Sequence, residues 1–165
     1  MALERLYIGV DPGDSGAVAA IGEDGRLVWV VDMVDAKPEL FFPEHLAAVE
    51  AQHAFPNIPA QTNFKMGVNL GYWRGVFEAI GVPFEEVAAS KWQRAICGAL
   101  PKDRPKKKRA IAEWAGRRWP TAELRGPRGA VLDGRSDALC LAEYARRQFV
   151  AYQAAELVPA GARSE

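Results

Sequence analysis

Short apolar runs separated by turn residues organise the first half of the chain. Pro12-Gly13 follows the first run and predicts a turn, and Asp24-Gly25 is a hairpin signal that makes the second and third runs antiparallel neighbours. Residues 34–44 contain two prolines and predict a loop with at most one turn of helix. Pro83 predicts that the last run is an edge strand, because proline cannot donate to a ladder. The predicted strands are 6–10, 16–22, 26–33, 46–50 and 82–87.

Apolar residues at helical spacing dominate the second half. Asn63 and Ser90 are plausible N-caps, and Pro105 suits the first turn of a helix. Glycines recur every four residues in the first of these helices, which predicts a flat face for close packing against a sheet or another helix; they are Gly67, Gly71 and Gly75. Residues 120–132 are rich in Gly, Pro and Arg and are predicted to be mobile. The predicted helices are 63–80, 91–96, 105–118 and 133–152.

The order of these elements predicts an α/β fold. Three meandering strands followed by alternating strands and helices favour a mixed sheet with helices on its faces. We expect one domain over residues 1–152, followed by a flexible tail over 153–165 in which Val158 to Glu165 are disordered.

Composition narrows the functional class without deciding it. The 49% hydrophobic and 25% charged fractions are ordinary for a globular protein. No apolar run approaches a membrane span, and the N-terminus lacks the features of a signal peptide, so we expect no membrane association. Cys97 and Cys140 predict buried free thiols rather than a disulfide framework, which fits a reducing cytoplasm.

A net charge of zero conceals a strong segregation of charge. Residues 1–90 carry 5 basic and 13 acidic side chains, whereas residues 91–128 carry 12 basic and 3 acidic ones. Such a division suits a polyanion held by basic residues and cut with the help of metal-binding acids. The alternative is that the two signs interleave on the folded surface.

Four acids fall at the ends of predicted elements. Asp11 and Glu50 each end an apolar strand, and Asp133 and Asp137 lie four residues apart at a helix start. Carboxylate oxygens are the ligands that Mg²⁺ prefers, and two such ions can act on both sides of a phosphodiester. Each acid also has a structural interpretation. Asp11 would cap a turn, Glu50 would be a rim charge and Asp133 would be an N-cap, which leaves Asp137 beside the apolar stripe unexplained.

Five stretches of the chain match a known family: Tyr7–Gly13, Ala48–Gln52, Asn63–Gly75, Val87–Trp92 and Asp133–Tyr144. In these stretches the chain resembles the RuvC-type Holliday junction resolvases, within the short phage-type branch of the RNase H-like superfamily. The resemblance implies an RNase H-like mixed five-stranded sheet flanked by helices. The separation of Asp133 and Asp137 by four positions is one longer than in many members.

The resemblance also implies a mechanism. Asp11, Glu50, Asp133 and Asp137 would bind two Mg²⁺ ions, for which Mn²⁺ would substitute. The enzyme would be a homodimer that makes paired symmetric nicks in a four-way DNA junction, and the family's dimerisation surface would fall on helix 63–80.

Residues that would contact DNA follow from the same resemblance. Phe55 matches a region where relatives place an aromatic ring against junction bases, although a lone loop Phe is equally often a hydrophobic anchor. His53 is interpreted by default as a surface loop residue, and Trp73 and Trp92 are interpreted as core residues. A run of lysines can equally be a solvated helix end. The predicted basic DNA contacts are Lys91, Arg104, Lys106, Lys107, Lys108 and Arg109.

Other functions stay open at this stage. A less selective branched-DNA or flap endonuclease needs the same acids. An actin-like nucleotide-binding module would use residues 11–16 as a phosphate loop, but it needs a second lobe for which 165 residues leave no room. An inactive DNA-binding scaffold would not need all four acids.

Overall fold

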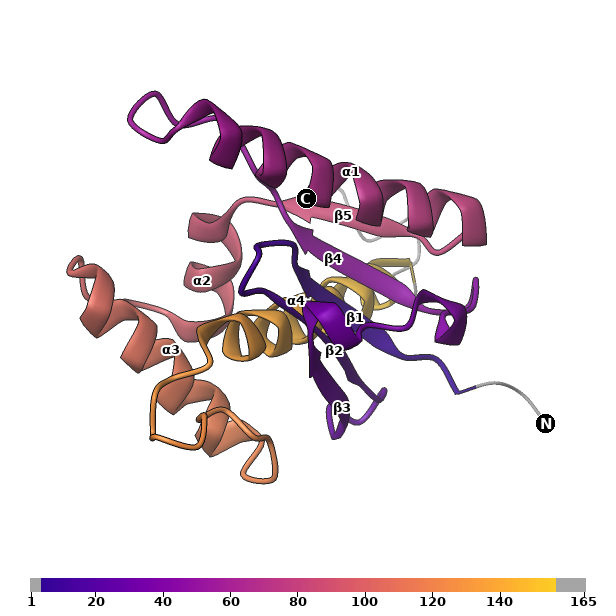
Figure 1. Ribbon diagram of the computed structural model, residues 1–165. Coiled ribbons are helices and arrows are strands. Elements are labelled where there is room, and N and C mark those ends of the chain that lie inside the picture. Colours follow the sequence, from indigo (N-terminus) through magenta and orange to yellow (C-terminus); the bar gives the residue numbers. More distant parts are fainter. Residues whose placement is uncertain (1–3, 157–165) are drawn as a thin grey trace, which may run out of the picture.

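Five strands form one mixed sheet in the order β3-β2-β1-β4-β5 (Figure 1). The structure, a computed structural model, describes residues 4–156. β3, β2 and β1 are antiparallel neighbours, whereas β1, β4 and β5 run parallel. The mixed five-stranded sheet predicted from the sequence is therefore confirmed. The strands are β1 Tyr7–Asp11, β2 Ala17–Ile21, β3 Leu27–Asp32, β4 Leu46–Glu50 and β5 Phe84–Val87.

Local turn chemistry explains how these strands are connected. Gly25 has φ of 77° in the turn between β2 and β3, a conformation that glycine adopts without strain. β5 begins directly after Pro83 and is an edge strand, as expected. The segment before β4 contains two short 3₁₀ turns, Met33–Asp35 and Pro38–Leu40, where the sequence predicted at most one.

Four helices cover the two faces of the sheet. Figure 1 shows α1 on one side and α4 crossing the other, with α2 and α3 beside α4. None of the described helices is long and apolar enough to cross a membrane. The helices are α1 Ala60–Ile80, α2 Ala89–Cys97, α3 Arg104–Arg118 and α4 Asp133–Glu156.

Strand alternation divides the core into two layers. Tyr7, Ala19 and Ala48 belong to the layer shared with α2, α3 and α4, which also buries Cys140. Their neighbours along the strands point the other way, into a layer rich in aromatic rings beneath α1. That second layer includes Phe41, Trp73, Phe77 and Phe84, whose ring centroids lie 5.6–5.9 Å apart in successive pairs.

Two predicted helix caps are wrong. α1 begins at Ala60 after Pro59, and Asn63 lies inside its first turn. There Asn63 accepts a hydrogen bond from the Phe55 amide and donates to the carbonyl oxygens of Phe55 and Ile58, so it fixes the preceding loop instead. The N-cap of α2 is Ala88 rather than Ser90, which is exposed within the helix.

The glycine face of α1 also differs from expectation. A methyl group added at Gly67, Gly71 or Gly75 would meet nothing within 4 Å, so these glycines pack against no other part of the described chain. α4 runs to Glu156, and the first four residues of the predicted flexible tail are therefore helical. Residues 158–165, predicted to be disordered, lie outside the described residues.

Candidate metal and nucleic-acid site

Parallel pairing of β1 with β4 brings the first two acids together. The register aligns Gly9 with Ala48 and Val10 with Val49, so Asp11 and Glu50 are the next residues at adjacent carboxyl ends. Both follow the alternation of Tyr7, Gly9 and Ala48 and lie on the face covered by α4. A one-residue slip in either strand would turn one carboxylate to the opposite face.

Close backbone contact places α4 over these strand ends. A methyl group at Gly9 would overlap the Ala138 carbonyl oxygen and the Ala142 nitrogen, so only glycine allows this approach of the helix to β1. Likewise, a methyl group at Gly134 would overlap the Ser15 carbonyl oxygen in the β1–β2 turn. The first turns of α4, which carry Asp133 and Asp137, are therefore pressed against the turn that follows Asp11.

The four carboxylates form one electrostatic cluster. Burial raises the pKa of Asp137 well above its usual value, and the negative charges of Asp11, Glu50 and Asp133 raise it further. Burial and the neighbouring Asp11 raise the pKa of Glu50 to about 7. Burial also raises the pKa of Asp11, which accepts a 3.1 Å hydrogen bond from the Gly13 amide. The structure thus gathers buried negative charge that repels itself.

One cation enters this cluster from α3. The Lys108 ammonium forms an ion pair with Asp133. Its positive charge partly offsets the rise in the pKa values of Asp11 and Asp137. The side-chain carboxylate of Asp137 has no hydrogen bond or ion pair among the described residues. It interacts with the other three acids and with Lys108 only through space. Positive charge from a single lysine therefore faces negative charge from four carboxylates.

Trp92 holds Glu50 in place from α2. Its indole nitrogen donates a 2.9 Å hydrogen bond to Glu50 Oε2, and the side chain is fully buried. The sequence correctly predicted a core tryptophan, but it gave Trp92 no part in the acidic site. The Lys91-Trp92 step directly after a strand was the available signal, because residues that follow a parallel strand lie near its carboxyl end.

Several basic residues at the start of α3 have no acidic partner. Asp103 is used as the helix cap and accepts a 3.0 Å hydrogen bond from the Lys106 amide. Lys91 differs, because it forms a 2.7 Å ion pair with Glu85 and lies over the Tyr144 ring. Charge segregation thus persists locally in the folded protein. Between residues 91 and 109 of the described chain, the basic side chains that form no salt bridge are Arg94, Lys102, Arg104, Lys106, Lys107 and Arg109.

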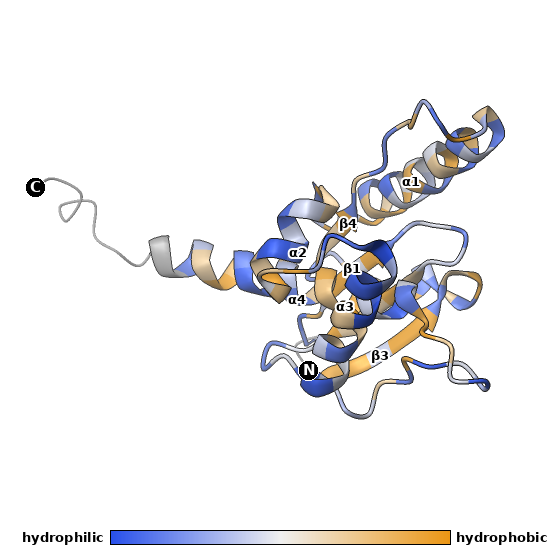
Figure 2. Cartoon of the chain, turned by 90° about the vertical axis from the view of Figure 1, so that its left-hand side faces the viewer, coloured by the Kyte–Doolittle hydropathy of each residue, from blue (hydrophilic) through white to orange (hydrophobic). Residues whose placement is uncertain are grey.

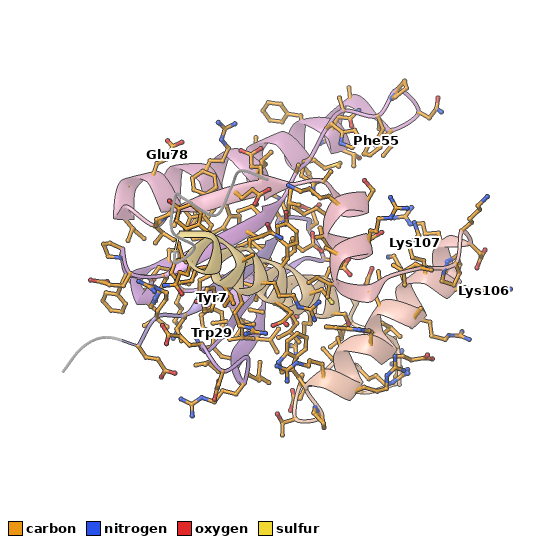
Figure 3. All side chains as sticks on the ribbon, turned by 180° about the vertical axis from the view of Figure 1, so that it is seen from behind. Tyr7, Trp29, Phe55, Glu78, Lys106 and Lys107 are labelled. Atoms are coloured by element: carbon orange, nitrogen blue, oxygen red, sulfur yellow. The ribbon has the colours of Figure 1, made fainter. Side chains whose placement is uncertain are left out.

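A cleft of about 730 Å³ extends from Glu50 along the loop before α1. His53, Phe55 and Arg104 are among the residues that line it. The ring centroids of His53 and Phe55 are 4.3 Å apart, and Phe55 is 39% exposed. Phe55, Lys106 and Lys107 lie at the same end of the molecule (Figure 3). An aromatic pair and free cations therefore adjoin the acidic cluster.

Comparison with solved structures identifies the architecture. A structure of Thermus thermophilus RuvC in complex with a Holliday junction substrate matches with a TM-score of 0.60 and 19% sequence identity, covering 90% of this chain and 96% of that chain. A second Thermus thermophilus RuvC structure matches with a TM-score of 0.56, 20% identity and the same coverage of both chains. This chain has a RuvC-like fold. No protein-family model matches the chain, and no curated protein matches it either.

Within the RuvC-like fold, the donor set suits a hard divalent cation. Four carboxylates supply only oxygen donors, and the raised pKa values of three of them show negative charge that a cation would relieve. No three Asp, Glu, His or Cys side chains of residues 4–156 stand close enough to hold a metal ion as they are arranged here. An ion would therefore require the carboxylates to move closer together and Asp133 to give up its pairing with Lys108.

Proposed function

We propose that this protein is a Holliday junction resolvase that hydrolyses phosphodiesters with two Mg²⁺ or Mn²⁺ ions. The observation that carries the proposal is the cluster of Asp11, Glu50 and Asp137 at the sheet's carboxyl edge, next to unpaired cations on α3. The RuvC-like fold supports it, and one of the matching structures holds a Holliday junction substrate. Bound ions would orient a water for attack and stabilise the leaving oxygen.

The chain's own residues have distinct roles in this proposal. Asp11, Glu50, Asp133 and Asp137 would hold the ions, and Trp92 would orient the Glu50 carboxylate through its hydrogen bond to Oε2. Lys108 supplies a positive charge beside Asp133, where a phosphate oxygen of the substrate would approach. Lys106, Lys107, Arg104 and Arg109 contact neighbouring phosphates, and Lys91 is kept as a weaker candidate because Glu85 already pairs with it. Phe55 stacks on an exposed junction base.

Selective cleavage of four-way junctions by this single site calls for a second copy of the chain. α1 exposes a ridge, here called the α1 stripe, that consists of Phe64, Val68 and Tyr72; these residues are 72%, 52% and 54% exposed. Figure 2 shows apolar positions distributed along this helix. Gly67 and Gly71 leave room beside the stripe for close approach. We infer a two-fold homodimer through the α1 stripe, which would match the symmetry of the substrate.

Two alternatives share this site. A branched-DNA or flap endonuclease would use the same acids with looser selectivity. An actin-like nucleotide-binding module would give the unpaired cations of α3 no task. Reduced thiols and a DNA substrate fit the cytoplasm of a bacterium, or of a phage host if the protein is phage-encoded.

Nicking of a labelled four-way junction tests the proposal. Wild-type protein with Mg²⁺ or Mn²⁺ should make paired symmetric nicks, and Asp11→Asn and Asp137→Asn should each abolish nicking while binding persists. Asp35→Asn is the matched control, because Asp35 is an exposed acid in the segment after β3 and does not line the cleft beside Glu50. Cutting of linear duplex and flap DNA at equal rates would favour the less selective nuclease. No cutting with either metal would refute the enzyme.

The dimer is tested separately by sedimentation. Val68→Glu should shift the protein from dimer to monomer, because it places a charge in the centre of the α1 stripe. Val150→Glu is the control, since Val150 on α4 is 49% exposed and lies outside the stripe. A dimer that survives Val68→Glu, or one that is lost equally in both variants, would contradict the assignment of the α1 stripe.

A further inference from the structure

A shallow hollow of about 360 Å³ lies where α2 ends and the chain turns into α3. Ser90, Gln93 and Arg94 of α2 line it, together with Lys102 of the linker and Lys107 of α3. It does not overlap the cleft that contains Glu50 and Phe55, because the two share no lining residue. Nothing in the proposed metal chemistry uses it.

The hollow is positively charged without compensation. Arg94, Lys102 and Lys107 are its three charged residues, and no acid lines it. None of the three forms a salt bridge within the described part of the chain. A contrasting surface hollow between α3 and β3 has both signs of charge in its wall, and there Arg135 pairs with Asp32 and Glu123. The α2–α3 hollow therefore presents three unpaired cations and no acid to an external anion.

The first turns of α3 connect this hollow to the acidic cluster. Consecutive residues of a helix point about 100° apart. Lys108 pairs with Asp133, while Lys107 lines the hollow, and Arg104 one turn earlier lines the cleft beside Glu50. A strand whose phosphate sits at the acids would thus have the hollow directly alongside. Figure 3 shows Lys107 between α2 and α3 and Lys106 pointing outward from the end of α3.

The lining chemistry selects backbone phosphate rather than bases. Two lysines, one arginine, a serine hydroxyl and a glutamine amide supply donors, and no aromatic ring lines the hollow. Phosphate oxygens take such donors irrespective of sequence, whereas base recognition in an open strand relies on stacking. The cleft beside Glu50, by contrast, contains the paired aromatic rings of Phe55 and His53, on which a base could stack.

We propose that the α2–α3 hollow binds the phosphodiester backbone of the duplex arm adjacent to the cut strand, without regard to sequence. This inference rests on the proposed function, because it assumes that branched DNA is the substrate. It adds Arg94 and Lys102 to the DNA interface, two residues that neither the motif nor the resemblance indicated. Their role is to anchor the arm, so they should affect affinity and leave the chemical step of bound substrate unchanged.

The test is the salt dependence of junction binding in EDTA. The variant is Arg94→Gln with Lys102→Gln, which removes two exposed charges. Each phosphate contact contributes roughly 0.9 to the slope of log K against log salt, so the slope should become shallower by about 2. The matched control is Arg117→Gln with Arg128→Gln, which removes the same charge from exposed residues outside the hollow. That control should leave the slope close to the wild-type value.

Several outcomes separate the two proposals. The inference stands if only the hollow variant loses slope, on two junctions of unrelated sequence, and its single-turnover nicking rate at saturating protein equals that of wild type. It fails if the hollow variant matches wild type, if the control loses as much slope, or if the loss depends on sequence. Those outcomes would not contradict the proposed nuclease function. Wild-type protein that binds no branched DNA would instead overturn both proposals.

Discussion

The two faces of the sheet are covered by long helices in opposite ways. α4 meets β1 backbone to backbone, because Gly9 and Gly134 have no side chain to hold it away. α1 is held off by large aromatic rings, among them Trp73 and Phe77, and its own glycines face open space. The α4 face concentrates the acids, whereas α1 exposes the apolar α1 stripe on the opposite side.

This difference shows where the fold tolerates change. On the α4 face, small displacements of the helix would move Asp133 and Asp137 relative to Asp11, so the geometry of the site depends on close packing. On the α1 face, an exposed stripe remains for a partner without any constraint from the chemistry. The same residue type, glycine, has opposite meanings on the two faces, because it permits internal contact on one and leaves an external surface on the other.

The largest expected effect is from Gly9→Ala. The added methyl group would collide with backbone atoms of Ala138 and Ala142, which cannot rotate away as a side chain can. Overpacking of this kind costs at least about 1–3 kcal/mol, and we expect the upper end or misfolding. Chemical denaturation measures the loss. A Gly9→Ala protein as stable as wild type would mean that α4 is not in contact with β1.

The charge on the α4 face makes the metal-free protein sensitive to pH. The pKa of Glu50 rises from 4.5 to about 7 on folding, so the folded state binds its proton more tightly. Stability should therefore fall as pH rises through that interval, by up to roughly 3 kcal/mol from Glu50. Thermal melts in EDTA should show this decline, and Glu50→Gln should flatten it. Mg²⁺ should restore stability near pH 7, and an equal slope in both proteins would contradict the cluster.

Two buried tryptophans allow a matched test across the sheet. Trp92 donates to Glu50 on the α4 face, and Trp73 donates to Met33 Sδ on the other. Trp92→Phe removes a hydrogen bond to a carboxylate that we propose binds metal, which we expect to weaken metal binding about 10-fold or more. Trp73→Phe should lose comparable stability without changing metal affinity. Calorimetric titration with Mn²⁺ measures the affinity, and equal affinities would limit Trp92 to packing.

The smallest effect is expected from Gly71→Ala on the α1 face. Alanine is favoured over glycine inside a helix by about 1 kcal/mol, and the new methyl group would meet no atom of the same chain. Gly71→Ala should therefore stabilise the isolated protomer slightly, in contrast to Gly9→Ala. Denaturation at concentrations below dimer association gives the value. Destabilisation of the protomer would show that the α1 stripe is covered from within the chain.

Much of the framework was accessible from local patterns. All five strands, the four helices and the antiparallel β2–β3 hairpin follow from apolar runs and turn residues, and their presence is confirmed. The helix starts were less accessible. Asn63 and Ser90 have side chains suited to capping, but Asn63 is engaged by the loop at Phe55 and Ser90 lies one residue inside α2. Capping preferences are weak compared with the packing that sets where a helix begins.

The sequence alone determined which residues could carry chemistry: four acids at element ends, a run of lysines and a fold able to join them. Only the tertiary structure decided how they meet. Of the basic run 106–109, Lys108 pairs with Asp133, whereas Lys107 lines a separate hollow. Trp92 donates a hydrogen bond to Glu50, which lies 42 positions earlier in the chain. The reason is physical. Strand and helix periodicities are local and readable, whereas contacts between distant segments depend on register, helix phase and the closeness of approach that glycine permits.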